Sequence, residues 1–257
     1  MSTDAPEPGE MSLLEHLDEL RSRLVKVSAA VVLGTIVGYV VFPELLDILI
    51  EPYCSVVARI NETGECNLII LKPLEAFSVR IKVSMLVGAF LGGPVIFWQL
   101  WRFIAPGLTA RERRLSAPFV VLSQVLFGIG IGFAWFVLPN ALSVLTTLGG
   151  PRIVPNLTAA EYISFILTTS VAFGVVFLLP VVLTFLALLG VLTAAAMRSA
   201  RPYAIVGVAI VAAIITSTTD PVTMLLMMAP MTVFYEISIL FAALFERRRR
   251  TQAAQLD

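Results

Sequence analysis

Two short segments place carboxylates beside arginines in a chain that otherwise carries few charges. HLDELRSRL, residues 16–24, stands directly before a long apolar run, and FIAPGLTARERRL, residues 103–115, follows another. Basic residues beside an apolar run orient a membrane helix, but acidic residues contribute little to that effect. Glu19 and Glu112 therefore need a different explanation. Either they form solvated ion pairs, as the i+4 spacing of Glu19 and Arg23 favours, or they bind a charged ligand.

The composition assigns the chain to the membrane class. Of its 257 residues, 58% are hydrophobic and 14% are charged, and the mean hydropathy is +0.91. Soluble domains carry about 25% charged residues. The net charge is zero, so a strongly charged partner such as nucleic acid is not indicated. One histidine and two cysteines make no set of transition-metal ligands, so we expect no metal or other cofactor and interpret His16 as an interfacial helix residue.

Six segments are long enough, or nearly so, to cross a hydrocarbon core of about 30 Å, which takes roughly 20 helical residues. They are 25–43, 76–104, 116–138, 161–190, 203–217 and 222–244. The second and the fourth contain Pro94 and Pro180, which predict tilts or kinks. The fifth has only 15 residues, which predicts local thinning of the bilayer or shelter by neighbouring helices.

The distribution of lysine and arginine predicts the orientation. If both ends of the chain lie inside, thirteen of the 18 basic residues fall on the cytoplasmic side and the other five fall outside. The positive-inside rule then gives six transmembrane helices with an N-in, C-in topology. We expect one all-α polytopic membrane domain over 11–245, a disordered tail over 1–10 and a basic cytoplasmic tail over 246–257. The polar N-terminus lacks the basic region of a cleaved signal peptide, so the first apolar segment should remain as an anchor.

The first segment carries a helix-start pattern. Ser12 and Glu15 match a capping box, in which each side chain satisfies a backbone N–H of the other residue. Apolar residues then recur at helical spacing: Leu13, Leu17, Leu20 and Leu24. The pattern predicts a short amphipathic helix on the inner membrane surface, leading into the first span.

The two charged segments, at this topology, resemble the signature segments of TatC, the multi-spanning subunit of the twin-arginine protein translocase. HLDELRSRL precedes the first span and FIAPGLTARERR follows the second, and the similarity covers roughly residues 11–245. It extends to Pro52 in the outer loop and to two short final spans. The resemblance implies a non-enzymatic, multi-pass protein of the bacterial inner membrane that serves as the receptor and core of protein export.

Under this resemblance, Glu19 and Glu112 would bind the consecutive arginines of signal peptides carried by folded substrate proteins. A guanidinium group is planar, stays charged and donates two parallel hydrogen bonds to a carboxylate, which lysine cannot reproduce. Four neighbours are expected to shape this site rather than touch the ligand: Leu20, Arg21, Phe103 and Pro106. The family also implies single-span partner subunits of the TatA/TatB type, self-assembly into larger complexes, contact with membrane lipids and transport driven by the proton-motive force.

Three further residues resemble family positions but also have structural explanations. Glu236 lies within the sixth span, where an ionisable group is costly and marks a functional position unless it snorkels or is protonated. Asp220 precedes Pro221 and fits a helix N-cap. Pro52 could simply fix the shape of the outer loop. Each of the three could instead contact a partner subunit.

The fourth span departs from the family pattern. Many relatives have a polar residue in a phrase like FGVxFExP, whereas this sequence reads FGVVFLLP, with Leu178 and Leu179 at that place. This departure argues against an essential carboxylate in span four. Four other polar residues could compensate: Gln124, Thr168, Thr169 or Glu236.

Cys54 and Cys66 share the outer loop, which faces the oxidising side in this topology. A disulfide between them would close a short loop and contribute about 3 kcal/mol in the chain-entropy model. The alternative is two unpaired, buried cysteines.

Two other functional classes fit the sequence less well than a translocase receptor. A proton-coupled small-solute transporter usually shows inverted repeats and charges at the membrane midplane, and no repeat is visible here. An intramembrane enzyme would need a nucleophile and base, or metal ligands, inside the spans, and the single histidine lies outside them. The sequence has no GxxxxGK[ST] motif, so we expect no ATP hydrolysis by this chain.

Overall fold

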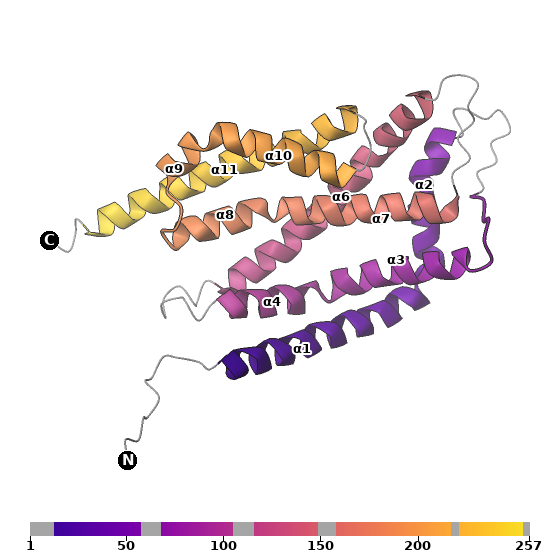
Figure 1. Cartoon of the computed structure of the whole chain (residues 1–257), viewed down its shortest axis with the longest axis horizontal. Coiled ribbons are helices and arrows are strands. Elements are labelled where there is room, and N and C mark those ends of the chain that lie inside the picture. Colours follow the sequence, from indigo (N-terminus) through magenta and orange to yellow (C-terminus); the bar gives the residue numbers. More distant parts are fainter. Residues whose placement is uncertain (1–12, 58–67, 105–115, 149–157, 217–220, 254–257) are drawn as a thin grey trace, which may run out of the picture.

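The structure, a computed structural model, consists of helices, most of which run back and forth along one long axis (Figure 1). It describes residues 13–57, 68–104, 116–148, 158–216 and 221–253. These residues form α1 (Leu13–Val40), α2 (Phe42–Val57), α3 (Glu75–Leu91), α4 (Gly93–Ile104), α6 (Ser116–Leu148), α7 (Ala159–Phe177), α8 (Leu179–Leu188), α9 (Ala194–Ser199), α10 (Arg201–Thr216) and α11 (Pro221–Ala253). The all-helical fold class is therefore confirmed over this part of the chain.

The helices make six passes in chain order: α1, α3 with α4, α6, α7 with α8, α10, and α11 (Figure 1). Four helical stretches are long and apolar enough to cross a membrane alone, namely Leu17–Val40, Ala117–Asn140, Ala159–Leu188 and Met227–Arg247. A bent pair and one shorter apolar helix complete the set: Glu75–Leu91 with Gly93–Arg102, and Arg201–Ile214. The pattern agrees with the six predicted spans, including the short fifth one.

The first helix starts and the last helix finishes at the same end of the molecule, as an even number of passes requires (Figure 1). We call this the inner end, following the orientation predicted from the basic residues. The opposite end, where α2 lies, is the outer end (Figure 1).

Two helices differ from the expected lengths. The amphipathic segment at the N-terminus is not a separate helix but forms the first turns of α1, which runs unbroken for 28 residues. No proline or glycine interrupts residues 13–33, so nothing in the backbone forces a break there. The last helix, α11, has 33 residues and is not short. The capping-box residue Ser12 lies outside the described residues.

The predicted kink in the second pass is present. α3 and α4 meet at Gly92 with a bend of 53°. Pro94 has no N–H to donate to the carbonyl of Phe90, four residues earlier. The side chain of Gln124 on α6 supplies a replacement, since its Nε2 donates to that carbonyl over 3.1 Å. The fourth pass is similarly interrupted at Leu178, between α7 and α8.

α1 and α3 pack closely because glycines lie on both facing surfaces. A Cβ atom on Gly34 would lie 2.9 Å from the Cα of Gly88, and one on Gly38 would lie 2.8 Å from the carbonyl oxygen of Ser84. A Cβ atom on Gly88 would lie 2.6 Å from the carbonyl oxygen of Val31. Small residues at such contacts let two membrane helices approach at the backbone. This pairing fixes how α1 is rotated against the second pass.

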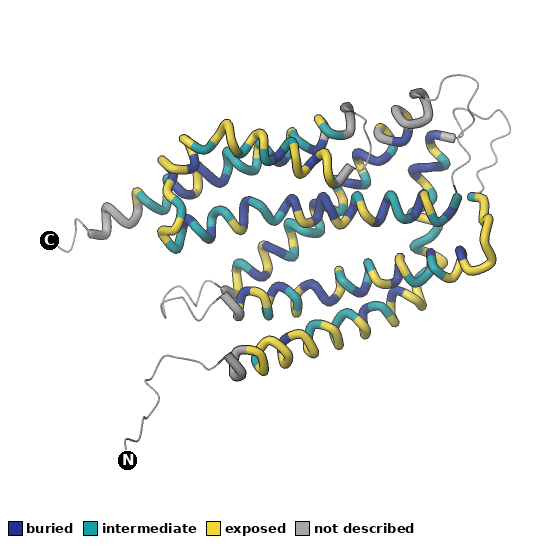
Figure 2. The backbone as a smooth tube through the Cα atoms, viewed as in Figure 1, coloured by how far each residue is buried: buried dark blue, intermediate teal, exposed yellow. Residues whose placement is uncertain are grey.

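α7 lies at the centre of the molecule, and its side chains are largely buried, whereas α1 is exposed along most of its length (Figure 2). Side chains of α7 take part in two apolar clusters, one with α2, α3 and α6 and one with α6, α10 and α11. A third cluster joins α4, α6 and α8 around Trp101 and Phe185. The exposed surfaces of α1, α6 and α10 are apolar, which fits contact with lipid rather than water.

Candidate functional site

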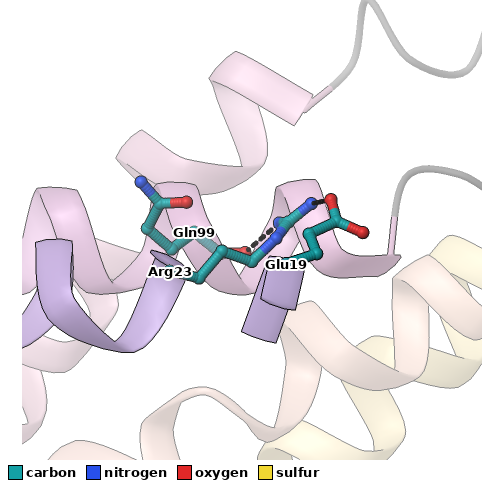
Figure 3. A network of polar contacts seen from close by, with 3 residues as sticks. All are labelled: Glu19, Arg23 and Gln99. Carbon is teal, nitrogen blue, oxygen red and sulfur yellow. Dashed lines mark hydrogen bonds and ion pairs between the residues drawn. The ribbon is translucent and has the colours of Figure 1, made fainter. Parts of the chain in front are cut away.

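At the inner end, Glu19 and Arg23 of α1 form an ion pair against α4 (Figure 3). The Nη2 atom of Arg23 donates to Oε1 of Glu19, and Nη1 donates to the backbone carbonyl of Gln99 over 3.0 Å. Arg23 is only 8% exposed, whereas the side chain of Glu19 is 37% exposed. A buried guanidinium requires hydrogen-bond acceptors, so these two contacts fix Arg23 between the helices. They also hold the carboxylate of Glu19 at the junction of α1 and α4.

Local helix geometry explains the pair. Residues four apart lie on one face of a helix, and the unbroken α1 keeps Glu19 and Arg23 in that relation. α4 follows the bend at Gly92, so the bend sets which part of α4 faces Arg23. The predicted i+4 ion pair is confirmed, but it is not a solvated pair, since its arginine is buried.

The other predicted members of this site are described only in part. Leu20 and Arg21 follow Glu19 on α1 and are exposed. Phe103 belongs to the last turn of α4, but its side chain is not described. The other two predicted residues, Pro106 and Glu112, lie outside the described residues, and so does the distance between Glu112 and Glu19.

Glu236 on α11 forms an ion pair with Arg201 at the start of α10. Nη2 of Arg201 lies 2.6 Å from Oε2 of Glu236, and the two side chains are 47% and 46% exposed. The neighbouring Tyr235 donates from its hydroxyl to the carbonyl of Met197 on α9 over 2.7 Å. These contacts tie α11 to the connection between the fourth and fifth passes. Asp220, the other acidic residue of this region of the sequence, lies outside the described residues.

Pro52 lies inside α2, a short helix in the outer connection between the first and second passes, and it is buried. Next to it, the rings of Tyr53 and Tyr162 lie 5.1 Å apart, and the hydroxyl of Tyr162 donates to the carbonyl of Leu49 over 2.8 Å. Burial raises the pKa of the Tyr53 phenol, so this ring stays neutral at physiological pH. The surroundings of Pro52 are therefore a packed contact between α2 and α7.

Cys54 also belongs to α2 and is disulfide-bonded. Cys66, the only other cysteine of the sequence, lies outside the described residues.

The fourth pass has apolar contacts at Leu178. Leu178 packs against the cluster of Phe97 and Trp101. Of the residues expected to compensate, Gln124 donates to the carbonyl of Phe90 at the kink, and Thr168 lies in a groove described below. Within the described residues, no group of three or more His, Cys, Asp or Glu could hold a metal ion.

Glu75, whose carboxylate binds backbone N–H groups of two segments at the outer end, was not identified from the sequence. The residue is 7% exposed although it is acidic. Its Oε2 accepts hydrogen bonds from the backbone N–H groups of Leu71 and Lys72 over 2.9 and 3.2 Å, and its Oε1 accepts one from Ala160 over 2.9 Å. A signal was available in the sequence, because Glu75 is an acidic residue at the very start of an apolar span, where an N–H group needs an acceptor.

These features define an α-helical membrane protein of six passes, with a carboxylate held by a buried arginine at its inner end. The family model for the "Sec-independent protein translocase protein (TatC)" matches residues 15–230. The chain belongs to the TatC family.

Individual relatives agree with this assignment over most of their length. The Sec-independent protein translocase protein TatC of Frankia casuarinae is 36% identical over 252 residues, which cover 96% of this chain and 69% of the relative. That of Aquifex aeolicus is 39% identical over 243 residues, covering 93% and 98%. A crystal structure of the twin-arginine translocase receptor TatC matches with a TM-score of 0.74 at 38% identity, covering 90% of this chain and 100% of that one. The resemblance seen in the two charged segments is confirmed, and the chain is a multi-pass protein of the bacterial inner membrane.

Proposed function

We propose that this chain is the receptor and core subunit of a twin-arginine translocase, which binds twin-arginine signal peptides at its inner end for the export of folded proteins. Membership of the TatC family supports this function. Within the proposal, the carboxylates of Glu19 and Glu112 bind the two arginines of the signal peptide.

The observation that carries the proposal is the position of Glu19. Its carboxylate lies at a helix junction on the inner end, is partly exposed, and already binds one guanidinium group, that of Arg23. A carboxylate has two oxygens and about four lone-pair directions, so it can accept a second guanidinium while Arg23 holds it in place. Arg23 is thus the positioning residue of the site, and its own anchor is the carbonyl of Gln99.

Energetics favour arginine over lysine at such a site. A hydrogen bond to a charged group contributes about 1.5–3 kcal/mol, and each 1.4 kcal/mol is a factor of ten in affinity. Loss of one bound arginine should therefore weaken binding by about 10- to 100-fold. Lysine donates as a point charge and cannot make the two parallel hydrogen bonds.

The test is direct binding of a twin-arginine signal peptide, compared with its twin-lysine version, to the purified chain in detergent. The variants are Glu112→Ala and Glu19→Gln, since the glutamine keeps an oxygen acceptor for the buried Arg23. Glu44→Gln serves as the control, because Glu44 is an exposed acid on α2 at the outer end. We expect each site variant to lose the preference for arginine and the control to keep it. Equal binding of both peptides by wild type and all variants would refute the assignment of the two carboxylates.

The proposal also includes the partner subunits of the translocase. Single-span subunits of the TatA/TatB type would assemble with this chain, and several copies of the assembly would form the transport complex. Pro52, Asp220 and Glu236 are the residues proposed for contact with those subunits or for support of the contact surface. Co-purification of tagged single-span subunits with wild type and with Glu236→Gln would test the contribution of the last of these.

A further inference from the structure

A groove of about 730 Å³ lies in the outer half of the molecule between α3, α7 and α10. α7 lies between the other two helices (Figure 1) and supplies half of the lining residues. Most of the lining is apolar, with Met85 and Val171 exposed along its length and Ile214 at the outer part of α10. The volume is in the range of ligand-binding clefts.

The charged group of the groove lies toward its outer end, and Thr168, a further polar residue, lies about one turn deeper on α7 than Ser164. Nζ of Lys82 on α3 donates to Oγ of Ser164 on α7 over 2.9 Å, and Lys82 is exposed. Both helices run inward from their first residues, Glu75 and Ala159, so Lys82 and Ser164 lie nearer the outer surface than the apolar lining. Ala89 lies seven residues further along α3, about 10 Å deeper at 1.5 Å per residue.

Lys82 has no carboxylate partner among the residues that the structure describes, and its recorded side-chain contact is the one with Ser164. An ammonium group at membrane depth needs an anion or water for its remaining donors. α10 is short, and it stops well before the level at which α3 and α7 begin (Figure 1). A span of 16 residues is about 24 Å long and falls short of a core of about 30 Å, a mismatch that local thinning of the bilayer can relieve.

We propose that this groove binds one anionic phospholipid of the outer leaflet, with its phosphate at Lys82 and Ser164 and an acyl chain along Met85, Ala89 and Val171. The charge and the polarity gradient of the groove match those of the lipid, whose anionic head faces outward and whose tail points toward the midplane. Thinning beside α10 brings the headgroups down to the level of Lys82. This site is independent of the proposed signal-peptide site, which lies at the opposite end of the molecule.

The test is native mass spectrometry of the full chain in detergent, titrated with phosphatidylglycerol or with phosphatidylcholine of the same acyl chains. We expect the wild-type chain to retain phosphatidylglycerol preferentially and Lys82→Gln to lower its occupancy about five-fold, as loss of one cation facing an anionic headgroup predicts. Lys82→Arg should keep the preference. Lys72→Gln is the matched control, since Lys72 is an exposed lysine of the same end outside the groove.

Three outcomes would overturn the proposal. Equal retention of phosphatidylglycerol by wild type and Lys82→Gln would remove the role of the lysine. Equal retention of both lipids would make the groove part of the nonspecific lipid shell, and retention of neither would show that the groove holds no lipid. Thermal unfolding of Lys82→Gln would verify its fold, and unchanged signal-peptide binding by this variant would show that the two sites fail or succeed separately.

Discussion

The carboxylate of Glu75 accepts a hydrogen bond from the backbone N–H of Ala160, 85 residues away in the sequence, over 2.9 Å. Ala160 lies in the first turn of α7, where backbone N–H groups have no partner within the helix. The N–H of Ala159 donates to the carbonyl of Ile69 over 2.9 Å, and that of Glu161 donates to Oγ1 of Thr158 over 3.2 Å. The start of the central helix is thus capped largely by Ile69 and Glu75, that is, by the first residue of α3 and the segment before it.

Replacing Glu75 with alanine should destabilise the outer end of the molecule. The change leaves the N–H groups of Leu71, Lys72 and Ala160 without their carboxylate acceptor. We expect a clear fall in melting temperature, and a smaller one for Glu75→Gln, which keeps one acceptor oxygen. Thermal unfolding in detergent measures both. Glu51→Ala, an exposed acid on α2, is the control, and an equal melting temperature for all three variants would contradict the capping role.

Gly88→Ala should be destabilising by about 1–3 kcal/mol, the usual cost of overpacking. The new Cβ atom would lie 2.6 Å from the carbonyl of Val31 and 2.7 Å from the backbone nitrogen of Thr35, so α1 would have to move. Gly132→Ala is the matched control, since a Cβ atom there meets nothing within 4 Å. Denaturant or thermal unfolding of the two variants should separate them, and similar stabilities would mean that α1 and α3 pack less closely than described.

The ion pair of Arg201 and Glu236 should contribute little to folding. Both side chains are nearly half exposed, and exposed pairs contribute about 0–1 kcal/mol. A double-mutant cycle of Arg201→Gln and Glu236→Gln should therefore give a coupling free energy below about 1 kcal/mol. If Glu236→Gln nevertheless abolishes export at normal stability, Glu236 has a role in transport. A large coupling energy would instead make the pair structural.

Reduction should destabilise the chain if Cys54 is bridged within the same molecule. Since the sequence has two cysteines, we predict a disulfide between Cys54 and Cys66, which would contribute about 3 kcal/mol in the chain-entropy model. Unfolding with and without dithiothreitol measures this contribution. The double variant Cys54→Ser/Cys66→Ser should not respond to the reductant. A dimer on a non-reducing gel would show that the bridge joins two chains and that the prediction is wrong.

The sequence by itself determined the membrane class, the six passes, the short fifth span and the interruptions near Pro94 and Pro180. These features depend on local properties of the chain, namely apolar run length, basic residues at span ends and the missing N–H of proline. The i+4 pair of Glu19 and Arg23 is also local, because it needs only an unbroken helix. The two charged segments sufficed to indicate the family.

Tertiary structure decided which of these residues meet across passes. No local pattern of α1 or α3 tells that Arg23 is buried against Gln99, that Gly34 faces Gly88, or that Glu75 caps α7. Those contacts depend on how each helix is rotated and tilted against its neighbours. In lipid, close packing and hydrogen bonds set that rotation. The hydrophobic pattern does not set it, because every face of a membrane span can be apolar. The amphipathic start of α1 illustrates the same limit, because its pattern fits a separate surface helix as well as the first turns of a continuous one.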